Sequence, residues 1–420
     1  MLRLSKTIRT PTSYYWKYLE IFPVDSLEHQ HGKDYIDILR QLPSNRTKKY
    51  PGKSIKDKCY SLGLYKRRLQ TPNLVFSIVI DKSISQLLIV PYGHSNPNAI
   101  ISSGIIGCQE HYLTQEKTMK QSPKIVGLGA MLWDIFPDAT HFGGAPANFA
   151  CHTSMLGGQV SMVSCVGRDQ LGFNALEFLQ QYGVNTATIA QSDDYPTGTV
   201  LVTLDQVGKP NFEIKTNVAW DGVPWSTEIA QLALETDAVC FGSLDQRSEM
   251  SRKTIQQFLK TTKQDCWRIF DINLRQHYYS PELIDQSLKL ANILKLNQEE
   301  LSVIESIIGL RNGEVDQLSQ LKKQFELELV ILTKGEKGSV LVSNQGVLEH
   351  PGLTIKVQDT VGAGDAFTAT LAIGLLQGID LEIMNQHANR VAAYVCSQSG
   401  AVPSLPPELL EFGTTHGVEF

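Results

Sequence analysis

The stretch Asp359-Thr360-Val361-Gly362-Ala363-Gly364-Asp365-Ala366-Phe367 is the most informative segment of this 420-residue chain. An apolar pattern of helical period follows it directly, which places its small residues at the start of a helix. Such a turn presents several backbone N–H groups to one point, and the helix dipole adds to their attraction for a phosphate or a developing anion. Asp365 falls in the first helical turn. There it would either face that anion or cap the helix, as acidic residues often do.

Outward from this segment, apolar runs of strand length alternate with helical patterns from Lys124 onward. The alternation is typical of a mostly parallel sheet covered by helices on both faces. Central strands are predicted at 160–166, 238–241, 268–272, 293–296 and 329–333, and helices at 230–235, 252–260, 283–290, 315–325, 364–376 and 381–396. The last two helices follow one another without a strand. The stretches 133–142 and 199–215 do not fit the alternation and are predicted to form a small separate sheet, a lid.

A second glycine-rich run is Phe142-Gly143-Gly144-Ala145-Pro146-Ala147-Asn148-Phe149-Ala150. Gly143 and Gly144 let a backbone approach a ligand closely, and the Asn148 amide both donates and accepts hydrogen bonds. The alternative is a tight turn before a capped helix. The run therefore indicates either a site for hydroxyl groups or a helix start.

Three polar motifs follow predicted strands: Asp271-Ile272-Asn273-Leu274-Arg275, Asn297-Gln298-Glu299-Glu300 and Thr333-Lys334-Gly335-Glu336-Lys337-Gly338. All three should lie at the carboxyl edge of the sheet, where open α/β folds bind ligands. Each has a plainer interpretation as well. Arg275 could form a solvent-facing salt bridge, Asn297 with Glu300 could cap a helix, and the third motif could be a charged hairpin turn.

The run from Asp359 to Phe367 resembles the C-terminal signature of the ribokinase family of carbohydrate kinases, also called the PfkB family. The run from Phe142 to Ala150, with Val166-Gly167-Arg168-Asp169 after it, resembles the N-terminal signature. The resemblance extends from about Lys124 to Pro406. It implies a ribokinase-like three-layer α/β sandwich with a mostly parallel central sheet and a small β-sheet lid. It also implies ATP as phosphoryl donor, Mg²⁺ and a sugar acceptor.

The family pattern carries residue roles onto this chain. It makes Asp365 the catalytic base, on a turn formed by Gly362, Ala363 and Gly364. Sugar-binding positions correspond to Asp134, Gly143, Gly144, Asn148 and Arg275. ATP-binding positions correspond to Asn297, Thr333, Gly335, Gly364 and Asn389. Glu300 corresponds to the residue that holds hydrated Mg²⁺, which keeps several waters and uses few protein carboxylates. Asp359 and Ser404 correspond to loops that bind a monovalent cation in many members, which implies K⁺.

Among sugars, the resemblance favours D-fructose, giving D-fructose 6-phosphate, because Trp133-Asp134-Ile135-Phe136-Pro137 is most similar to bacterial-type fructokinases. Those enzymes often have Gly-Glu after the first strand, where this chain has Gly129-Ala130. Ribose, 2-keto-3-deoxygluconate or a nucleoside are the alternative substrates. A hypothesis of another class is a non-catalytic relative that binds sugar or nucleotide, against which the intact Gly362, Gly364 and Asp365 argue.

Composition bounds the partners and the compartment. A net charge of −5 gives no basic footprint for nucleic acid. The 7 cysteines are scattered and form no C-x-x-C pair, which predicts reduced thiols and a cytoplasmic location. The histidines have no zinc-site spacing, and no apolar run approaches the length of a membrane span. The expected partners are a sugar and ATP, with a homodimer formed through the lid.

The first 120 residues differ in character from the rest. They hold 18 Lys or Arg and 9 Asp or Glu, whereas the remainder holds 20 and 34. We expect residues 1–120 to be a poorly ordered N-terminal extension of unknown role. Residues 121–410 should then form the carbohydrate kinase domain, with lid strands near 133–142 and 199–215. The basic, acid-free start also fits an organellar transit peptide, and Met119 could instead be the true start.

Overall fold

The computed structural model describes residues 123–204 and 210–413 and, before residue 123, the backbone of five strands. These five are β1 (Leu4–Ser5), paired with β2 (Tyr18–Leu19), and the antiparallel set β3 (Leu64–Thr71), β4 (Leu74–Asp81) and β5 (Gln86–Pro91). The chain divides into two units, Met1–Met119 and Lys120–Phe420. We expected residues 1–120 to be poorly ordered. Apart from these five strands, that segment lies outside the described residues.

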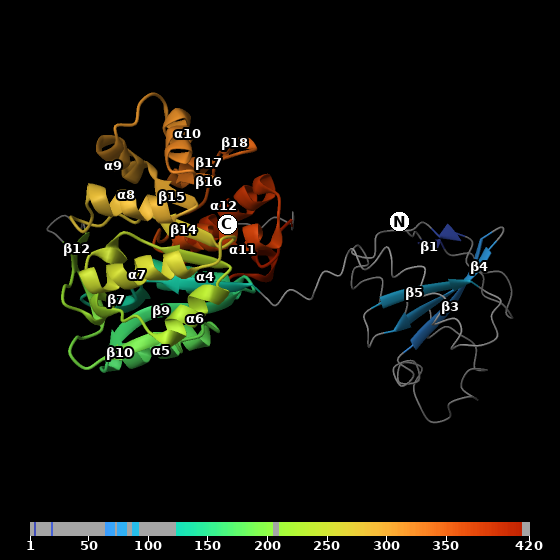
Figure 1. Cartoon of the computed structure of the whole chain (residues 1–420), viewed down its shortest axis with the longest axis horizontal. Helices are drawn as coiled ribbons and strands as arrows, with labels where there is room; N and C mark the ends of the chain where they lie inside the picture. Colours follow the sequence, from blue (N-terminus) through green and yellow to red (C-terminus); the bar gives the residue numbers. More distant parts are fainter. Residues whose placement is uncertain are drawn as a thin grey trace. The chain divides into compact units, whose positions relative to one another are not determined.

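A nine-stranded sheet forms the centre of the second unit (Figure 1). Its strands, in order across the sheet, are β10 (Ile189–Ser192), β9 (Gln159–Gly167), β6 (Lys124–Leu128), β13 (Ala238–Phe241), β14 (Trp267–Asp271), β15 (Ile293–Asn297), β16 (Leu329–Thr333), β17 (Ser339–Ser343) and β18 (Gly346–His350). The run from β10 to β16 is parallel, and β17 and β18 add antiparallel strands. All five predicted central strands lie in this sheet. The predicted α/β fold class is confirmed.

Helices cover both faces of the sheet, so the unit has three layers. One face carries α6 (Thr227–Glu235), α7 (Glu249–Thr261), α8 (Pro281–Leu290), α9 (Gln298–Ile308) and α10 (Glu314–Gln324). The other carries α4 (Ala145–Met155), α5 (Gln170–Gln181), α11 (Ala363–Gln377) and α12 (Leu381–Cys396). As predicted, α11 and α12 follow one another directly. In the described part of the chain, no helix is long and apolar enough to cross a membrane.

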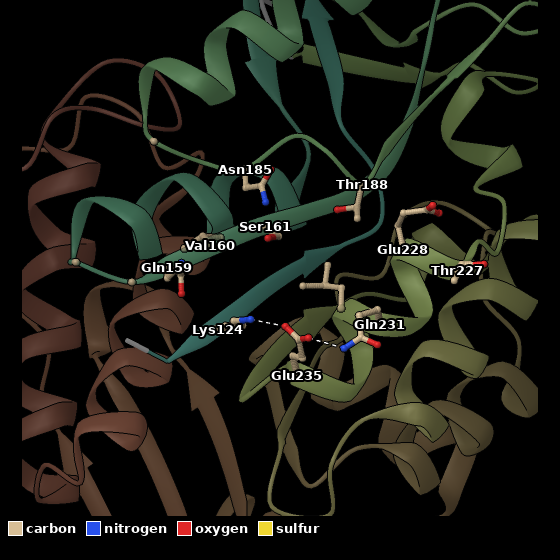
Figure 2. A pocket seen from close by; sticks show the side chains of 14 residues that line it. Lys124, Gln159, Val160, Ser161, Asn185, Thr188, Thr227, Glu228, Gln231 and Glu235 are labelled. Carbon is tan, nitrogen blue, oxygen red and sulfur yellow. Dashed lines mark hydrogen bonds and ion pairs between the residues drawn. The ribbon is translucent and has the colours of Figure 1, made fainter. Parts of the chain in front are cut away.

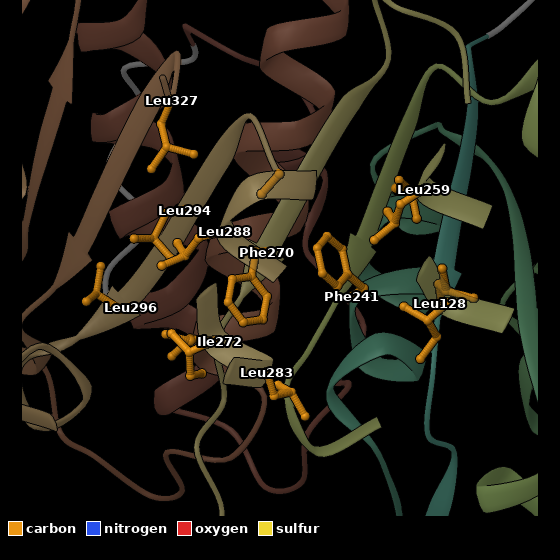
Figure 3. Packing of buried hydrophobic residues seen from close by; sticks show 14 of the residues in the cluster. Leu128, Phe241, Leu259, Phe270, Ile272, Leu283, Leu288, Leu294, Leu296 and Leu327 are labelled. Atoms are coloured by element: carbon orange, nitrogen blue, oxygen red, sulfur yellow. The ribbon is translucent and has the colours of Figure 1, made fainter. Parts of the chain in front are cut away.

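Continuous apolar strands explain why the sheet is buried on both faces. Side chains of β13 and β14 alternate between two separate hydrophobic clusters, one on each side. In the first cluster, the rings of Phe241 and Phe270 stack with centroids 5.1 Å apart, and Leu259 of α7 and Leu283 of α8 belong to the same cluster (Figure 3). Burying both phenyl groups contributes about 1.5–3 kcal/mol each. The site motifs therefore stand on a fixed framework.

The two stretches that broke the alternation form a separate four-stranded sheet. Its order is β12 (Pro210–Ile214), β11 (Gly198–Leu204), β7 (Leu132–Ile135), β8 (Thr140–Gly143). Strands β7 and β8 form a hairpin, and β11 pairs in parallel with β7. A small cluster of its own, with Leu132, Val200 and the buried Trp220, packs one side of it. This is the small sheet that the predicted fold class includes.

Asp169 joins the small sheet to the large one. Its carboxylate caps α5 by accepting from Gly172 N at 2.8 Å, and it also accepts from Thr197 N at 2.8 Å and Thr197 Oγ1 at 2.7 Å. Thr197 directly precedes β11, and its hydroxyl accepts from Gly167 N at the end of β9. These bonds lower the pKa of Asp169 despite the opposing effect of burial. The Gly-Arg-Asp motif thus fixes where the small sheet begins.

Candidate active site

Helix α11 begins without a cap. Gly362, its N-cap residue, has φ 80° in the left-handed region, and no side chain caps the helix. A Cβ at Gly362 would lie 2.1 Å from the carbonyl oxygen of Ala401, so the turn requires glycine. Among the described residues, Ala363 N makes only a long 3.4 Å bond to Thr360 O, and the N–H groups of Gly364 and Asp365 find no acceptor. These donors are available to an anion.

The Asp365 carboxylate does not cap α11 either. It accepts a 2.8 Å hydrogen bond from Asn148 Nδ2 on α4, the neighbouring helix. Asp365 is only 9% exposed. Burial first, and the nearby charge of Asp271 second, raise the pKa of Asp365 to about 7, while Asn148, Lys295 and Arg275 oppose the rise. A carboxylate poised near neutral pH has the acid strength that a general base needs.

Asn148 and the two glycines before it lie beside Asp365. Asn148 is 3% exposed, and its Oδ1 has no hydrogen-bond partner among the described residues. Gly144 has φ 108°, and a Cβ there would lie 2.5 Å from Ala130 O. A Cβ at Gly143 would lie 2.8 Å from Asp134 Oδ2. The glycines therefore let the β7–β8 hairpin and the start of α4 approach one another, and leave one buried amide oxygen free for a donor.

Arg275 lies close enough to Asp134 for its positive charge to act on the Asp134 carboxyl group. Burial raises the pKa of Asp134 to about 6, and His141 and Arg275 oppose that rise. The Arg275 guanidinium donates to Leu274 O at 2.9 Å and to Asn273 Oδ1 at 3.1 Å. Arg275 also opposes the raised pKa of Asp365 and of Glu300. Its positive charge therefore acts on all three carboxylates, and it forms no ion pair with any of them within the described structure.

Asn297 and Glu300 form a capping box at the start of α9. Asn297 Oδ1 accepts from Glu300 N at 2.9 Å, and Glu300 Oε2 accepts from Asn297 N at 2.8 Å. The other carboxylate oxygen of Glu300 accepts from Leu274 N at 3.1 Å. The helix-cap alternative is thus present in the geometry. Both oxygens of the Glu300 carboxylate are therefore held by backbone N–H groups, so this residue would hold Mg²⁺ through water molecules, which that ion commonly keeps.

The candidate ATP residues after β16 lie together. Thr333 ends β16 and pairs across the ladder with Ser339 of β17. Ser339 Oγ accepts from Asn389 Nδ2 of α12 at 2.8 Å, and Asn389 Nδ2 also lies 2.8 Å from Asn385 O. Gly335 has φ 57°, and a Cβ there would meet open space. The Asn389 amide nitrogen is therefore engaged within the protein, while Gly335 borders solvent.

The two candidate monovalent-cation residues are not held alike. Asp359 Oδ1 accepts from Val361 N at 3.0 Å, and Oδ2 accepts from Gly400 N at 3.1 Å. The 359–361 and 400–401 segments therefore meet beside Gly362. Ser404 instead is exposed, and its carbonyl accepts from Tyr394 Oη at 3.1 Å. No described hydrogen bond joins Ser404 to Asp359.

Asp271, Lys295 and Thr368 belong to the site although the sequence motifs gave them no role. Lys295 Nζ donates to Asp271 Oδ1 at 3.0 Å, and Thr368 Oγ1 donates to Asp271 Oδ2 at 2.9 Å. All three side chains are buried. One signal was present in the sequence: Lys295 is a charged residue inside the apolar strand 293–296, and buried lysines are rare unless paired.

A hollow of about 950 Å³ lies at the opposite edge of the sheet, around the starts of β6 and β9 (Figure 2). Lys124 and Glu235 form an ion pair there, Gln231 donates to Glu235, and Asn185 is among the other residues that line the hollow. None of the predicted site residues is among those that line it. Open α/β sheets bind ligands at the carboxyl ends of their strands, so this hollow is not the candidate active site.

Comparison with known proteins adds three findings. The sequence model described as "pfkB family carbohydrate kinase" matches residues 138–408. An uncharacterised sugar kinase of Pyrococcus horikoshii is 33% identical over 269 residues, which cover 62% of this chain and 82% of that protein. A fructokinase of Salmonella typhimurium is 28% identical over 301 residues, covering 67% and 96%.

Solved structures agree on the fold. The Pyrococcus horikoshii sugar kinase superposes with a TM-score of 0.58 at 30% identity, over 66% of this chain and 93% of that one. It has also been solved in complex with ATP. A Vibrio cholerae fructokinase with bound fructose, ADP and calcium ion superposes with a TM-score of 0.57 at 24% identity, over 68% and 96%.

Proposed function

The chain belongs to the pfkB family of carbohydrate kinases, and on that premise we propose that it phosphorylates D-fructose with ATP to give D-fructose 6-phosphate. The observation that carries the proposal is the buried Asp365 carboxylate, which stands at the uncapped start of α11 and meets Asn148 at 2.8 Å. A proton acceptor and a set of free N–H donors are thereby placed in one helical turn. Phosphoryl transfer to a hydroxyl group requires both.

In the proposed reaction, Asp365 accepts the proton of the sugar hydroxyl as the oxygen forms its bond to the γ-phosphorus of ATP. The bond from that phosphorus to the bridging β–γ oxygen breaks, and ADP leaves with the electron pair. The backbone N–H groups of the turn from Gly362 through Ala363 and Gly364 to Asp365 stabilise negative charge on the transferring group. The proton on Asp365 is then released to solvent.

The sugar is proposed to lie between the small sheet and α4. Asp134 accepts from its hydroxyl groups, and Asn148 Oδ1, which has no partner among the described residues, accepts from another. Gly143 and Gly144 keep the backbone close to the ring, and Arg275 donates to hydroxyl oxygens from the rim. The similarity to fructokinases such as that of Salmonella typhimurium, at 28% identity, supports fructose as the acceptor.

The nucleotide is proposed to lie along the loops after β15 and β16. Thr333, Gly335 and Gly364 border its phosphates, while Asn297 and Asn389 approach it from α9 and α12. Glu300 would hold hydrated Mg²⁺, whose chemistry is to neutralise phosphate charge. Asp359 and Ser404 would border K⁺. The ATP complex of the Pyrococcus horikoshii relative supports the nucleotide assignment.

We also propose a cytoplasmic location and a homodimer. The cysteines Cys151, Cys165, Cys240, Cys266 and Cys396 are all free thiols, which fits a reducing compartment. Phe212 on β12 of the small sheet is 47% exposed, and exposed aromatic side chains are enriched where subunits meet. Sedimentation of the purified protein with a Phe212→Ser variant as control measures whether the dimer forms there.

The test of the proposed function is ADP release from ATP with a panel of acceptors. The panel holds fructose, fructose 6-phosphate, ribose, 2-keto-3-deoxygluconate and a nucleoside. We expect the highest kcat/KM for fructose, and product analysis should place the phosphate on the 6-hydroxyl. A higher kcat/KM for another acceptor would replace fructose and leave the kinase assignment standing. Binding of ATP without turnover of any acceptor would favour a non-catalytic relative.

A further inference from the structure

Three buried side chains join two strands of the large sheet to the first turn of α11. Asp271 ends β14, Lys295 belongs to β15 and Thr368 to α11. The Asp271 carboxylate accepts from Lys295 Nζ at 3.0 Å with one oxygen and from Thr368 Oγ1 at 2.9 Å with the other. The side chains of the ion pair are 6% and 4% exposed. Both oxygens of the carboxylate are therefore used, one on the sheet and one on the helix.

Contacts continue from this pair into the catalytic turn. Thr368 Oγ1 also lies 3.0 Å from Gly364 O, so the hydroxyl sits between Asp271 and the turn. A Cβ at Gly364 would lie 3.0 Å from Lys295 Nζ, and it would crowd the ammonium group. The turn that carries Asp365 thus rests directly on a buried ion pair. Two opposite charges withdrawn from water are stabilising only when both are well paired, so this arrangement is demanding to maintain.

Charged groups surround Asp365 on several sides. Asp271 faces it from β14, Lys295 from β15 and Arg275 from the loop after β14, while the Cys240 thiol of β13 lies on the same side and stays protonated because burial raises its pKa. The negative charge of Asp271 raises the pKa of Asp365, and the positive charge of Lys295 lowers it. The two members of the ion pair therefore act on the base with opposite signs.

We propose that Asp271 is a positioning residue for phosphoryl transfer: with Lys295 and Thr368 it holds the Gly364–Asp365 turn on the sheet and balances the charge around the base. The inference rests on the proposed function, since it assigns Asp365 the role of proton acceptor. Asp271 touches neither reacting atom and acts through the helix turn and through its charge.

The experiment makes two measurements on the wild type, Asp271→Asn, Lys295→Met and the double variant. The first is kcat as a function of pH. The second is the titration of the Asp365 carboxyl group by ¹³C NMR, with the signal assigned by its loss in Asp365→Asn. Removing the negative charge should move the acidic limb and the titration to lower pH. Removing the positive charge should move both to higher pH. Each shift should be about one pH unit for a unit charge within about 10 Å, and the double variant should return near the wild-type position. Shifts of the same sign, or none, would overturn the proposal.

Thr368 supplies a test that does not disturb the ion pair's charges. Thr368→Val should lower kcat about tenfold or more without moving the acidic limb of the kcat–pH profile. Thr368→Ser keeps the hydroxyl group, so its kcat should be close to that of the wild type. Wild-type kcat in Thr368→Val would overturn the positioning role even if the single charge variants fail to fold. Asp237→Asn is the matched control, because it breaks another Lys–Asp pair. Lys263 Nζ donates to Asp237 Oδ1 at 2.5 Å, and Asp237 directly precedes β13, at the end of that strand opposite the candidate site. Asp237→Asn should change the melting temperature alone.

Failure of the inference and failure of the proposed function give different results. If the wild type turns over no acceptor, the proposed function is wrong, and if Asp365→Asn turns over sugar normally, Asp365 is not the proton acceptor. If Asp365→Asn is inactive while the titration of Asp365 ignores both members of the ion pair, only the inference is wrong. The NMR titration needs no turnover, so it decides the inference in either case.

Discussion

From the sequence alone, Asp365 fits two roles, a helix cap and a proton acceptor. Its hydrogen-bond partner in the structure distinguishes them. An acid in the first turn of a helix usually caps it, yet here the carboxylate bonds to Asn148 on another helix and leaves the N–H groups of its own turn unused. Burial beside Asp271 raises its pKa to about 7. The geometry and the acid strength therefore favour a proton acceptor over a cap.

Asp365→Asn keeps the size of the side chain and removes its ability to take a proton. We expect kcat to fall by roughly 10²–10⁴-fold with little change in ATP affinity or melting temperature. Asp380→Asn is the matched control, because Asp380 is a true cap that accepts from Glu382 N at 2.9 Å at the start of α12. Near-normal turnover in Asp365→Asn would contradict the catalytic role.

The acidic limb of turnover should also report on Asp365. Only the ionised carboxylate accepts a proton, and its pKa is raised from 3.8 to about 7. Turnover should therefore fall tenfold per pH unit as the pH drops below about 7, rather than below about 4 as for an ordinary aspartate. The measurement is kcat between pH 5 and 9 at saturating ATP and sugar. A flat profile down to pH 5 would show that a group of ordinary acidity limits the rate.

The sequence predicted where the motif residues lie in the fold better than it predicted which side chains they contact. Asn148 and Asp365 follow glycine-rich turns, a feature that a linear pattern reveals, and the fold joins them by a hydrogen bond. Asp134 was assigned through the family resemblance alone, and its role stays a prediction. The Asp271–Lys295 pair escaped because pairing depends on which strands become neighbours, and β14 and β15 are adjacent only once the sheet order is known. No described hydrogen bond joins Ser404 to Asp359, and their shared assignment to a monovalent-cation loop, which rests on the family resemblance, stays a prediction.

At the scale of elements, contacts of Arg247 hold the segment that follows β12, the edge strand of the small sheet. Arg247 donates to Asp221 Oδ1 at 2.7 Å, to Asp221 Oδ2 at 2.9 Å and to Lys215 O at 2.6 Å, just after β12. Its guanidinium also lies 3.9 Å above the ring of Trp220. Because β11 pairs with β12 on one side and places Val200 opposite Asp134 on the other, we expect this contact to affect the proposed sugar site.

Arg247→Met should loosen that edge and leave the mostly buried Asp221 side chain without its ion-pair partner. Breaking a buried ion pair costs about 3–5 kcal/mol, so the melting temperature should fall. The KM for sugar should rise while the KM for ATP stays near wild type. Lys253→Met is the control, because it removes the exposed Lys253–Glu249 pair, and such pairs contribute at most about 1 kcal/mol. Equal rises in both KM values would mean that the whole site is disturbed.

Element prediction succeeded where the pattern is strong. The strands were found because short apolar runs that alternate with helical patterns are typical of a buried parallel sheet. Helices α4 and α5 and the hairpin β17–β18 were not predicted as elements. Helix α4 is buried on most of its surface between the sheet and α11, so it lacks the polar face by which an amphipathic helix is recognised.

At the scale of the whole molecule, the described part of the site belongs to one of the two units. Both large hydrophobic clusters and every candidate site residue lie between residues 123 and 413. The family match covers residues 138–408. No candidate site residue falls in the first unit, Met1–Met119. We therefore infer that catalysis does not require it.

A chain that starts at Met119 should fold and phosphorylate sugar with unchanged kcat and KM. Removing an independent unit leaves the core of the other intact, so its melting temperature should also be unchanged. Side-by-side assays of the full chain and the shortened one measure this. An insoluble or largely inactive product would mean that residues 1–118 form part of the kinase fold.

The bond between Asn148 and Asp365 spans 217 residues of sequence. During synthesis at about 5–20 residues per second, roughly 10–40 s pass between the appearance of the amide and that of the carboxylate. Until then the ribosome carries a growing chain that has the first sheet strands but neither base nor phosphate turn. A prematurely terminated product could not consume ATP. We therefore expect phosphoryl transfer only from chains that have been translated beyond Asp365.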